Sequence, residues 1–301
     1  MNKRKINNYF NKTIIFLIVL IVGIFFKDKV GDVSFAFKDN DIQITDKSNL
    51  EIYFFDVGQA DSIFIKNNDD TMLIDGGNNA DGNNLVNYLR DELKIKDIDI
   101  IVGTHPHEDH IGGMDEVIDS FSIGKIYLPD ATTTSKTFES LLDSIEKKDY
   151  NISIPIEDEV FELGNLKFKV IYTGSDENDL NNTSIVLKMI FGNTSYLFTG
   201  DATSKTEKLI LDKDINVDVL KVGHHGSKYS TTDKFLEKVK PKYAIIQVGK
   251  DNNYNHPNKE TLERLDKYNV KVYRTDIDNT IKLISDGNKI TFTSLETNID
   301  G

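Results

Sequence analysis

The sequence predicts an α/β domain over residues 50–301, in which two sheets are covered by helices. Two observations predict this fold class. Short apolar runs alternate along the chain with longer segments in which apolar residues recur every three or four positions, as expected for strands and helices in turn. The chain also has 301 residues, of which 39% are hydrophobic, so a domain of this length can bury a sizeable core.

The expected elements follow one another as strands and helices in alternation. Strands are predicted at the short apolar runs, which are residues 51–55, 62–65, 71–74, 98–103, 125–128, 166–172, 184–190, 195–199, 217–222, 243–248 and 270–273. Helices are predicted where the apolar spacing is three and four, which holds for residues 84–93, 113–120, 136–147, 205–211, 232–239 and 259–267. No internal repeat interrupts this order, so a single domain is expected.

Residues 1–36 differ from the rest of the chain and predict a membrane anchor or a signal segment. Residues 13–26 are continuously apolar and follow a basic run, so the positive-inside rule places residues 37–301 outside the cytoplasm, at the cell membrane or secreted. Residues 34–36 have the small-x-small form of a cleavage site, but charged residues separate them from the apolar run. We therefore favour an uncleaved anchor, followed by a polar linker at residues 37–49, over a cleaved signal or a buried core helix.

The composition excludes several classes of site. With 36 basic and 49 acidic residues the net charge is −13, which repels a phosphate backbone at long range, so no stable binding of duplex DNA is expected. A local metal site can still hold one phosphate, because the charge of the ion dominates at short range. The chain has no cysteine, which excludes disulfides, thiolate metal ligands and cysteine nucleophiles.

The histidines gather in three places, and each place follows an apolar run that ends in glycine or a turn. They are His105, His107, His110, His224, His225 and His256. Because ligand sites collect at the carboxyl ends of strands in α/β sheets, this context predicts one common site.

The first group, His105-x-His107-x-Asp109-His110, predicts a metal centre. Residues two apart in an extended segment point the same way, so His105 and His107 can reach one cation together. The following turn offers Asp109 and His110 to a second cation. Imidazole and carboxylate ligands without thiolate suit zinc, with manganese or iron as the alternative.

Three aspartates at strand ends complete the predicted centre. Asp75 closes a strand and is a suitable acceptor for the N–H of a ligand histidine, although a turn aspartate explains it too. Asp201 closes another strand and supplies a carboxylate able to bridge two metals. Asp61 ends the connection between the first two strands and is expected to help orient the site, with a simple hairpin turn as the alternative.

The order of Asp75, the run from His105 to His110, Asp201 and a later histidine resembles that of the metallo-β-lactamase superfamily, over roughly residues 50–290. Four further segments resemble the C-terminal hydrolase domain of ComEC-type DNA-uptake proteins, namely residues 56–61, 181–184, 199–201 and 223–227. The sequence contains one long apolar segment and no multi-helix channel, so a stand-alone relative of that domain is expected.

The resemblance implies an αββα sandwich with two metals at one edge. Metal one would be held by His105 and His107, metal two by Asp109 and His110, and Asp201 would lie between them. The superfamily usually gives metal one a further histidine, but none occurs between residues 110 and 224. Asn182 lies near that place and would offer a weak amide oxygen, so a single-metal state stays open.

Two histidine assignments also stay open. His225 is favoured as the last ligand of metal two, with His256 as the close alternative. The remaining histidines, His224 and His256, would contact phosphate or protonate the leaving group. Together with Asp109 they are the predicted catalytic residues.

The predicted activity is hydrolysis by a hydroxide shared between two cations, with its pKa lowered toward ~7. A phosphodiesterase is the leading hypothesis; single-stranded DNA outside the cell is the substrate that the resemblance implies, and a small phosphodiester is the alternative. A β-lactam or thioester hydrolase is a second reading. An iron–oxygen reductase is less favoured, because that branch has glutamate where His107 stands. The incomplete metal-one set also keeps open a non-catalytic surface binding module.

Overall fold

The computed structural model describes residues 49–176, 178–297 and 299–301. The predicted anchor at residues 13–26 and almost all of the predicted linker lie outside the described residues. Within the described part, no helix combines the length and the apolar character that crossing a membrane requires.

The first sheet holds the amino-terminal strands and the last two strands of the chain. Its order is β15-β14-β1-β2-β3-β4-β5-β6. The bounds are β1 Leu50–Phe54, β2 Ser62–Asn67, β3 Asp70–Gly76, β4 Asp97–Val102, β5 Ser122–Tyr127, β6 Ile152–Ser153, β14 Thr280–Ser285 and β15 Ile290–Leu295. Strands β3 to β6 run parallel, whereas β1 pairs antiparallel with both β2 and β14.

The second sheet is formed by the strands between β6 and β14, in the order β13-β12-β11-β10-β9-β8-β7. The bounds are β7 Val160–Leu163, β8 Leu166–Tyr172, β9 Val186–Phe191, β10 Thr194–Phe198, β11 Val219–Lys221, β12 Tyr243–Ile246 and β13 Lys271–Arg274. Strands β10 to β13 run parallel, so their carboxyl ends share one edge.

The main core lies between the two sheets. Side chains from the first sheet, such as Phe54 and Ile65, and from the second, such as Phe168 and Met189, are completely buried in one cluster. Each buried side chain of this size contributes about 1.5–3 kcal/mol of hydrophobic free energy. Strands of both sheets, apart from the short β6, contribute side chains to this layer, so the two sheets pack directly against each other.

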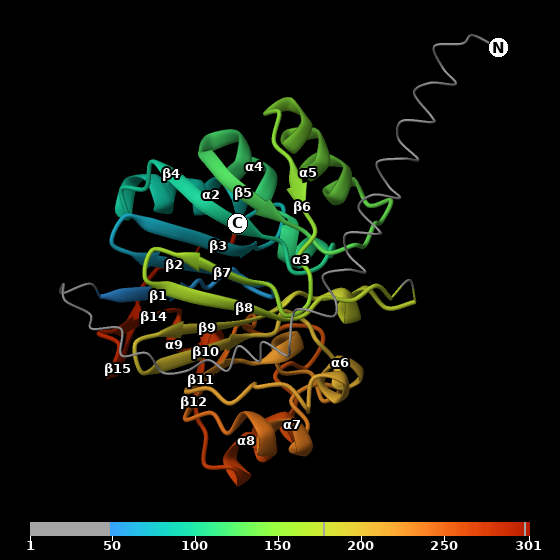
Figure 1. Ribbon diagram of the computed structural model, residues 1–301, viewed down its shortest axis with the longest axis vertical. Coiled ribbons are helices and arrows are strands. Elements are labelled where there is room, and N and C mark those ends of the chain that lie inside the picture. The colour runs from blue at the N-terminus through green and yellow to red at the C-terminus, as the bar shows by residue number, and fades with distance from the viewer. Residues whose placement is uncertain (1–48, 177, 298) are drawn as a thin grey trace, which may run out of the picture. The chain divides into compact units, whose positions relative to one another are not determined.

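Helices cover the outer face of each sheet (Figure 1). On the first sheet they are α2 (Gly82–Asn87), η1 (Tyr88–Glu92), α4 (Met114–Ser120) and α5 (Lys136–Lys147), and their buried residues form a second cluster with β4 and β5. On the second sheet they are α6 (Ser204–Leu209), α7 (Asp233–Val239) and α8 (Lys259–Lys267). Buried residues of α7 and α8, and Ile210 directly after α6, form a third cluster. The predicted two-sheet α/β architecture is therefore confirmed.

Hydrogen bonds join the two sheets at the edge where the parallel strands β4 and β12 end. The backbone N–H of Ile185 donates to the carbonyl of Thr104, which joins the start of β9 to the segment after β4, at 2.9 Å. Gln247, directly after β12, donates from Nε2 to the carbonyls of Phe55 and Ser62, at 3.0 and 2.8 Å. These bonds cross between the sheets, so the loops of both sheets are fixed relative to one another.

Candidate metal centre

The histidine motif leaves the carboxyl end of β4 and turns into the short helix α3 (Glu108–Ile111). His105 is completely buried, and its Nε2 lies 3.0 Å from Nδ1 of His107. The two rings are inclined to each other by 75°, and these two nitrogens lie close enough to approach one cation together. His110 lies within α3 and is also completely buried.

Two glycines after the motif allow another loop to approach it closely. A Cβ atom on Gly112 would lie 2.3 Å from backbone atoms of Asn78 and Asn79, and one on Gly113 would lie 2.5 Å from the carbonyl oxygen of Gly76. The loop after β3 can pack against the motif because these side chains are absent. It brings Asp75 to the motif.

Four side chains from three separate segments converge on one point. They are Asp109, His110, Asp201 and His225, whose ligand atoms all lie within 4.8 Å of one another. Nε2 of His110 lies 3.3 Å from Oδ1 of Asp201, and Nε2 of His225 lies 3.3 Å from Oδ2 of Asp109. The sequence pattern predicted each of these residues, and the fold brings them together from both sheets.

Hydrogen bonds on the far side of each imidazole set its tautomer. Nδ1 of His225 lies 3.0 Å from the carbonyl oxygen of Gln247, which can only accept, so this nitrogen carries the proton. Nδ1 of His110 lies 2.8 Å from Oδ2 of Asp75. Ligand histidines in metal sites typically donate their second N–H to a carbonyl or a carboxylate in this way.

The facing atoms of the cluster have no hydrogen-bond partners. Nε2 of His110, Nε2 of His225 and Oδ1 of Asp201 are buried and unsatisfied among the described residues. Buried polar atoms without partners cost about 1–3 kcal/mol each. A divalent cation between these atoms would satisfy all of them, so the donor set fits a metal ion.

The electrostatics of the cluster favour a positive charge at the same point. Burial alone would lower the pKa of His225, but Asp201 and Asp61 outweigh it and raise this pKa to about 10. Burial opposes the same change at His110, whose pKa Asp201 and Asp75 raise well above its usual value. Burial would likewise raise the pKa of Asp201, yet His110 and His225 hold it well below the ordinary range.

Asp61 is paired with a buried lysine that lies outside the histidine and aspartate motifs. Nζ of Lys221 lies 2.5 Å from Oδ2 of Asp61, and both side chains are almost completely buried. Oδ1 of Asp61 lies 3.3 Å from Nδ1 of His225, so the carboxylate supports this ring from behind. A single lysine within the apolar run of β11 is the sequence signal that would have found it.

The loop that carries the histidine pair has a strained backbone. His224 and His225 have φ of 51° and 50°, in the left-handed region that side chains other than glycine rarely adopt. Such residues cost of order 1–3 kcal/mol each and cluster at functional sites. In this conformation His225 points into the cluster, and Nε2 of His224 lies 3.7 Å from Oδ2 of Asp201.

His224 and His256 lie on the wall of an open cavity of about 330 Å³ above the cluster. Their rings are 5.7 Å apart between centroids, and Nδ1 of each is buried without a partner among the described residues. Burial, followed by the charges of His224 and His225, lowers the pKa of His256 to about 4. His256 does not belong to the four-residue group, which contains His225 instead.

Asn182 does not offer a free oxygen, which argues against the weak amide ligand expected at this position. Its Oδ1 accepts hydrogen bonds from Thr203 and Thr206, at 2.6 and 3.2 Å. Its Nδ2 donates to Asp176 and Asp179. Both ends of the amide are used to hold the surrounding turn, which is a structural role.

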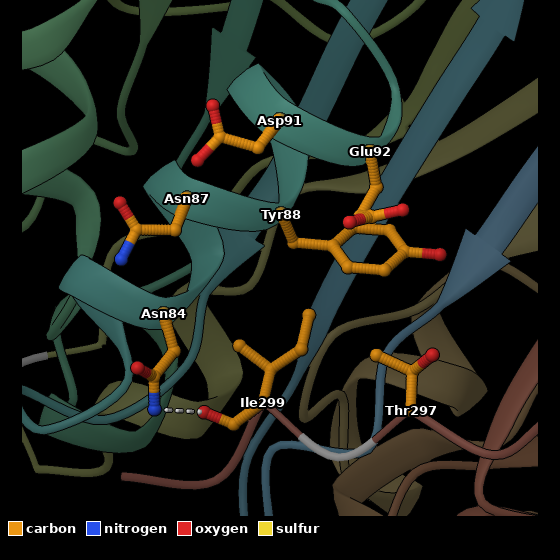
Figure 2. A pocket seen from close by; sticks show the side chains of 7 residues that line it. All are labelled: Asn84, Asn87, Tyr88, Asp91, Glu92, Thr297 and Ile299. Atoms are coloured by element: carbon orange, nitrogen blue, oxygen red, sulfur yellow. Dashed lines mark hydrogen bonds between the residues drawn. The ribbon is translucent and has the colours of Figure 1, made fainter.

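A second cavity, of about 340 Å³, is lined by residues of α2 and η1 and by residues close to the carboxyl terminus. Figure 2 shows Tyr88 and Glu92 beside Thr297 and Ile299, with Nδ2 of Asn84 donating to the carbonyl of Ile299 at 3.1 Å. None of the six histidines lines it. The chemistry-bearing residues therefore mark the first cavity as the candidate site.

Comparison with known proteins relates this arrangement to described families. Residues 55–250 match the sequence model of the metallo-beta-lactamase superfamily. The chain is 30% identical to ComE operon protein 3 of Bacillus subtilis (strain 168), over 78% of this chain and 33% of the relative. It is 25% identical to Competence protein ComA of Neisseria gonorrhoeae, over 78% of this chain and 32% of the relative. The chain thus spans about a third of the length of these curated relatives.

Solved structures share the fold at low sequence identity. YhfI from Bacillus subtilis, described as a metallo-beta-lactamase fold protein, superposes with a TM-score of 0.52 at 13% identity, over 79% of this chain and 100% of that one. CmlA, a diiron β-hydroxylase from Streptomyces venezuelae, gives a TM-score of 0.51 at 14% identity, over 80% of this chain and 54% of that one. At these identities the likeness concerns the fold alone.

Proposed function

Because the chain belongs to the metallo-beta-lactamase superfamily, whose members are typically metal-dependent hydrolases, we propose that it hydrolyses phosphodiester bonds. The observation that carries the proposal is the convergence of Asp109, His110, Asp201 and His225, whose ligand atoms lie within 4.8 Å of one another. Zinc is the proposed metal and manganese the alternative, because the ligands are imidazoles and carboxylates.

The chain's own residues have distinct proposed roles around the metals. Asp109, His110 and His225 would hold one cation, His105 and His107 a second, and Asp201 would bridge them. Bound divalent cations supply Lewis acidity that activates water and offsets charge on a phosphate. Asp75, Asp61 and Gln247 keep the imidazole rings oriented toward the cations through the contacts described above.

The open cavity supplies the proposed contacts to substrate. His224 and His256 line it beside Asp201, so either imidazole can donate a hydrogen bond to a phosphate oxygen or a departing oxygen. Tyr254 also lines it, is 67% exposed, and has its ring 5.8 Å from that of His256. An exposed aromatic face beside a phosphate site suits a nucleobase, because every base can stack.

Single-stranded DNA or a small phosphodiester is the proposed substrate. The names of the relatives, a competence protein and a ComE operon protein, support a DNA-related role. The net charge of −13 disfavours a long duplex footprint, whereas one phosphate at the metals requires no such surface. We place the domain outside the cytoplasm, held at the membrane through residues 13–26, on the basis of the basic and apolar order of the amino-terminal sequence.

The test is a three-substrate assay of the purified full chain in detergent, with zinc or manganese added. We expect turnover of bis(p-nitrophenyl) phosphate and of a single-stranded oligonucleotide, reduced at least ~100-fold in Asp201→Ala because the bridging carboxylate is lost. Turnover of a chromogenic cephalosporin alone would replace this function with β-lactam hydrolysis. Stoichiometric metal without turnover of any substrate would identify a binding module.

A further inference from the structure

Asn181, next to the structural Asn182, faces the cavity above the metal cluster. It lines this cavity together with His107, Asp109 and Asp201. Its Oδ1 is buried and has no hydrogen-bond partner among the described residues. A carbonyl oxygen in this state is costly to bury unless something binds it.

The turn that carries Asn181 is fixed on both sides of the site. The carbonyl of Asn181 accepts from the backbone N–H of Ser184, at 3.2 Å, and Oγ of Ser184 accepts from the backbone N–H of Asp201, at 3.1 Å. The next residue, Ile185, donates to the carbonyl of Thr104, directly before His105. The turn η2 (Leu180–Thr183) is thereby tied to the segments that carry His105 and Asp201.

Apart from the shared Asp201, His105 and His107 have no histidine or acid grouped with them as a further donor among the described residues. Nε2 of His105 lies 3.0 Å from Nδ1 of His107, close to the spacing of neighbouring ligands around an ion that each binds at about 2.0–2.1 Å. The groups of three or more histidines and acids found among the described residues include neither of them. A further protein ligand at this pair would therefore be an atom of another kind.

We propose that Oδ1 of Asn181 is a further protein ligand of the divalent cation held by His105 and His107, in addition to the carboxylate of Asp201 that this cation would share. This inference rests on the metal centre of the proposed function but not on its phosphodiesterase activity. A neutral amide oxygen adds a dipole and no charge, so this cation is bound more weakly than the one at Asp109, His110 and His225. Oxygen in place of a third imidazole also shifts the preference of this site toward manganese.

The test is a cation titration of the full chain after removal of metal with a chelator. Isothermal titration with Mn²⁺ is expected to show two binding events in the wild type. Asn181→Ala is expected to keep the tighter event and to weaken the second by roughly 10-fold or more. Asn181→Asp, which places a charged oxygen at the same position, is expected to bind the second ion more tightly than the wild type does.

Asn84→Ala is the matched control, because it removes an amide that lines the other cavity (Figure 2) and should leave both binding events unchanged. Circular dichroism checks that each variant is folded. If Asn181→Ala shows two binding events with the affinities of the wild type, the inference is overturned. A single binding event in the wild type would also overturn it. Two events in a wild type that turns over no phosphodiester would leave the inference standing and remove the proposed function.

Discussion

Asp75 controls the orientation of His110 from within the core. Its Oδ2 accepts from Nδ1 of His110 and from Oγ1 of Thr104, both at 2.8 Å, and its Oδ1 accepts from the backbone N–H of Thr104 at 2.7 Å. Asp75 itself has a left-handed backbone, with φ of 59°. The carboxylate thus aligns a ligand ring and, through Thr104, the start of the histidine motif.

We predict that Asp75→Asn lowers the affinity for zinc by roughly 10–100-fold, because an amide holds the imidazole N–H less strongly than a carboxylate does. Isothermal titration with zinc, after bound metal has been removed with a chelator, measures this affinity. Asp99→Asn is the control, since Asp99 also accepts from a backbone N–H, that of Thr71 at 2.9 Å, without contacting a histidine. Equal zinc affinities in Asp75→Asn and the wild type would contradict the proposed orienting role.

At the level of residues, the sequence identifies the histidines and aspartates of the site. It does not identify which of the neighbouring amide side chains faces the site. Histidines and aspartates at fixed spacing after strands predicted the members of the four-residue group. Sequence could not separate Asn181 from Asn182, because adjacent residues in a tight turn point in different directions. Only the contacts of Asn182 with Thr203 and Thr206 decide which amide is structural.

Among the elements, the turn from α3 into α4 packs closely against the backbone of the loop after β3. A Cβ atom on Gly112 would lie 2.3 Å from the backbone of the loop after β3. We predict that Gly112→Ala lowers the free energy of unfolding by about 1–3 kcal/mol, because backbone must move to make room. Tm falls by roughly 2–4 °C for each kcal/mol in a domain of this size.

The Gly112→Ala variant is compared with Glu139→Ala, an exposed position on α5 that should unfold like the wild type. Displacement of the loop also moves Asp75, so Gly112→Ala should bind zinc more weakly as well as unfold earlier. A variant with unchanged Tm and zinc affinity would show that the loop adapts without cost. The two measurements, thermal unfolding and titration, use the same samples.

Most strands and helices were predictable because their apolar spacing is regular, but four strands were missed. β6 and β7 are short and carry exposed apolar residues such as Ile152 and Val160. β14 and β15 alternate polar and apolar residues, a signal that could have predicted them. β14 pairs with β1, which lies at the other end of the domain sequence. This pairing follows from tertiary packing, which the local spacing of apolar residues does not encode.

For the molecule as a whole, the family predicted from the motif order is confirmed by the match over residues 55–250 and by the competence-protein relatives. The order of motifs carries this information because it reflects which strand ends meet at one edge. The division of the chain between two sheets, with a return to the first sheet at β14, required the structure.

We predict that zinc stabilises the whole domain and does so more at about pH 8 than at about pH 6. A ligand at 100 times its Kd stabilises by about 2.7 kcal/mol, or on the order of 5–10 °C in Tm. The pKa of His225 is raised to about 10, so below that pH a cation must displace its proton, and affinity falls as pH falls. This competition is the same linkage by which the raised pKa stabilises the cation-free protein fully below about pH 6.5 and less as pH rises toward 10.

Thermal unfolding of the chelated full chain, with and without zinc at both pH values, measures this effect. Addition of zinc is expected to raise the Tm of Asp201→Ala much less than that of the wild type, because the variant lacks the carboxylate between the imidazoles. An increase in Tm on zinc addition that is larger at the lower pH would contradict competition between zinc and the proton on His225.

The four converging side chains are divided evenly along the chain. Asp109 and His110 precede the point, between β6 and β7, at which the polypeptide passes to the second sheet, and Asp201 and His225 follow it. Two fragments separated at that crossing would each contain half of the coordination sphere. Neither fragment alone would contain the complete ligand set, so we expect metal concentration to govern how readily the separated fragments reassociate.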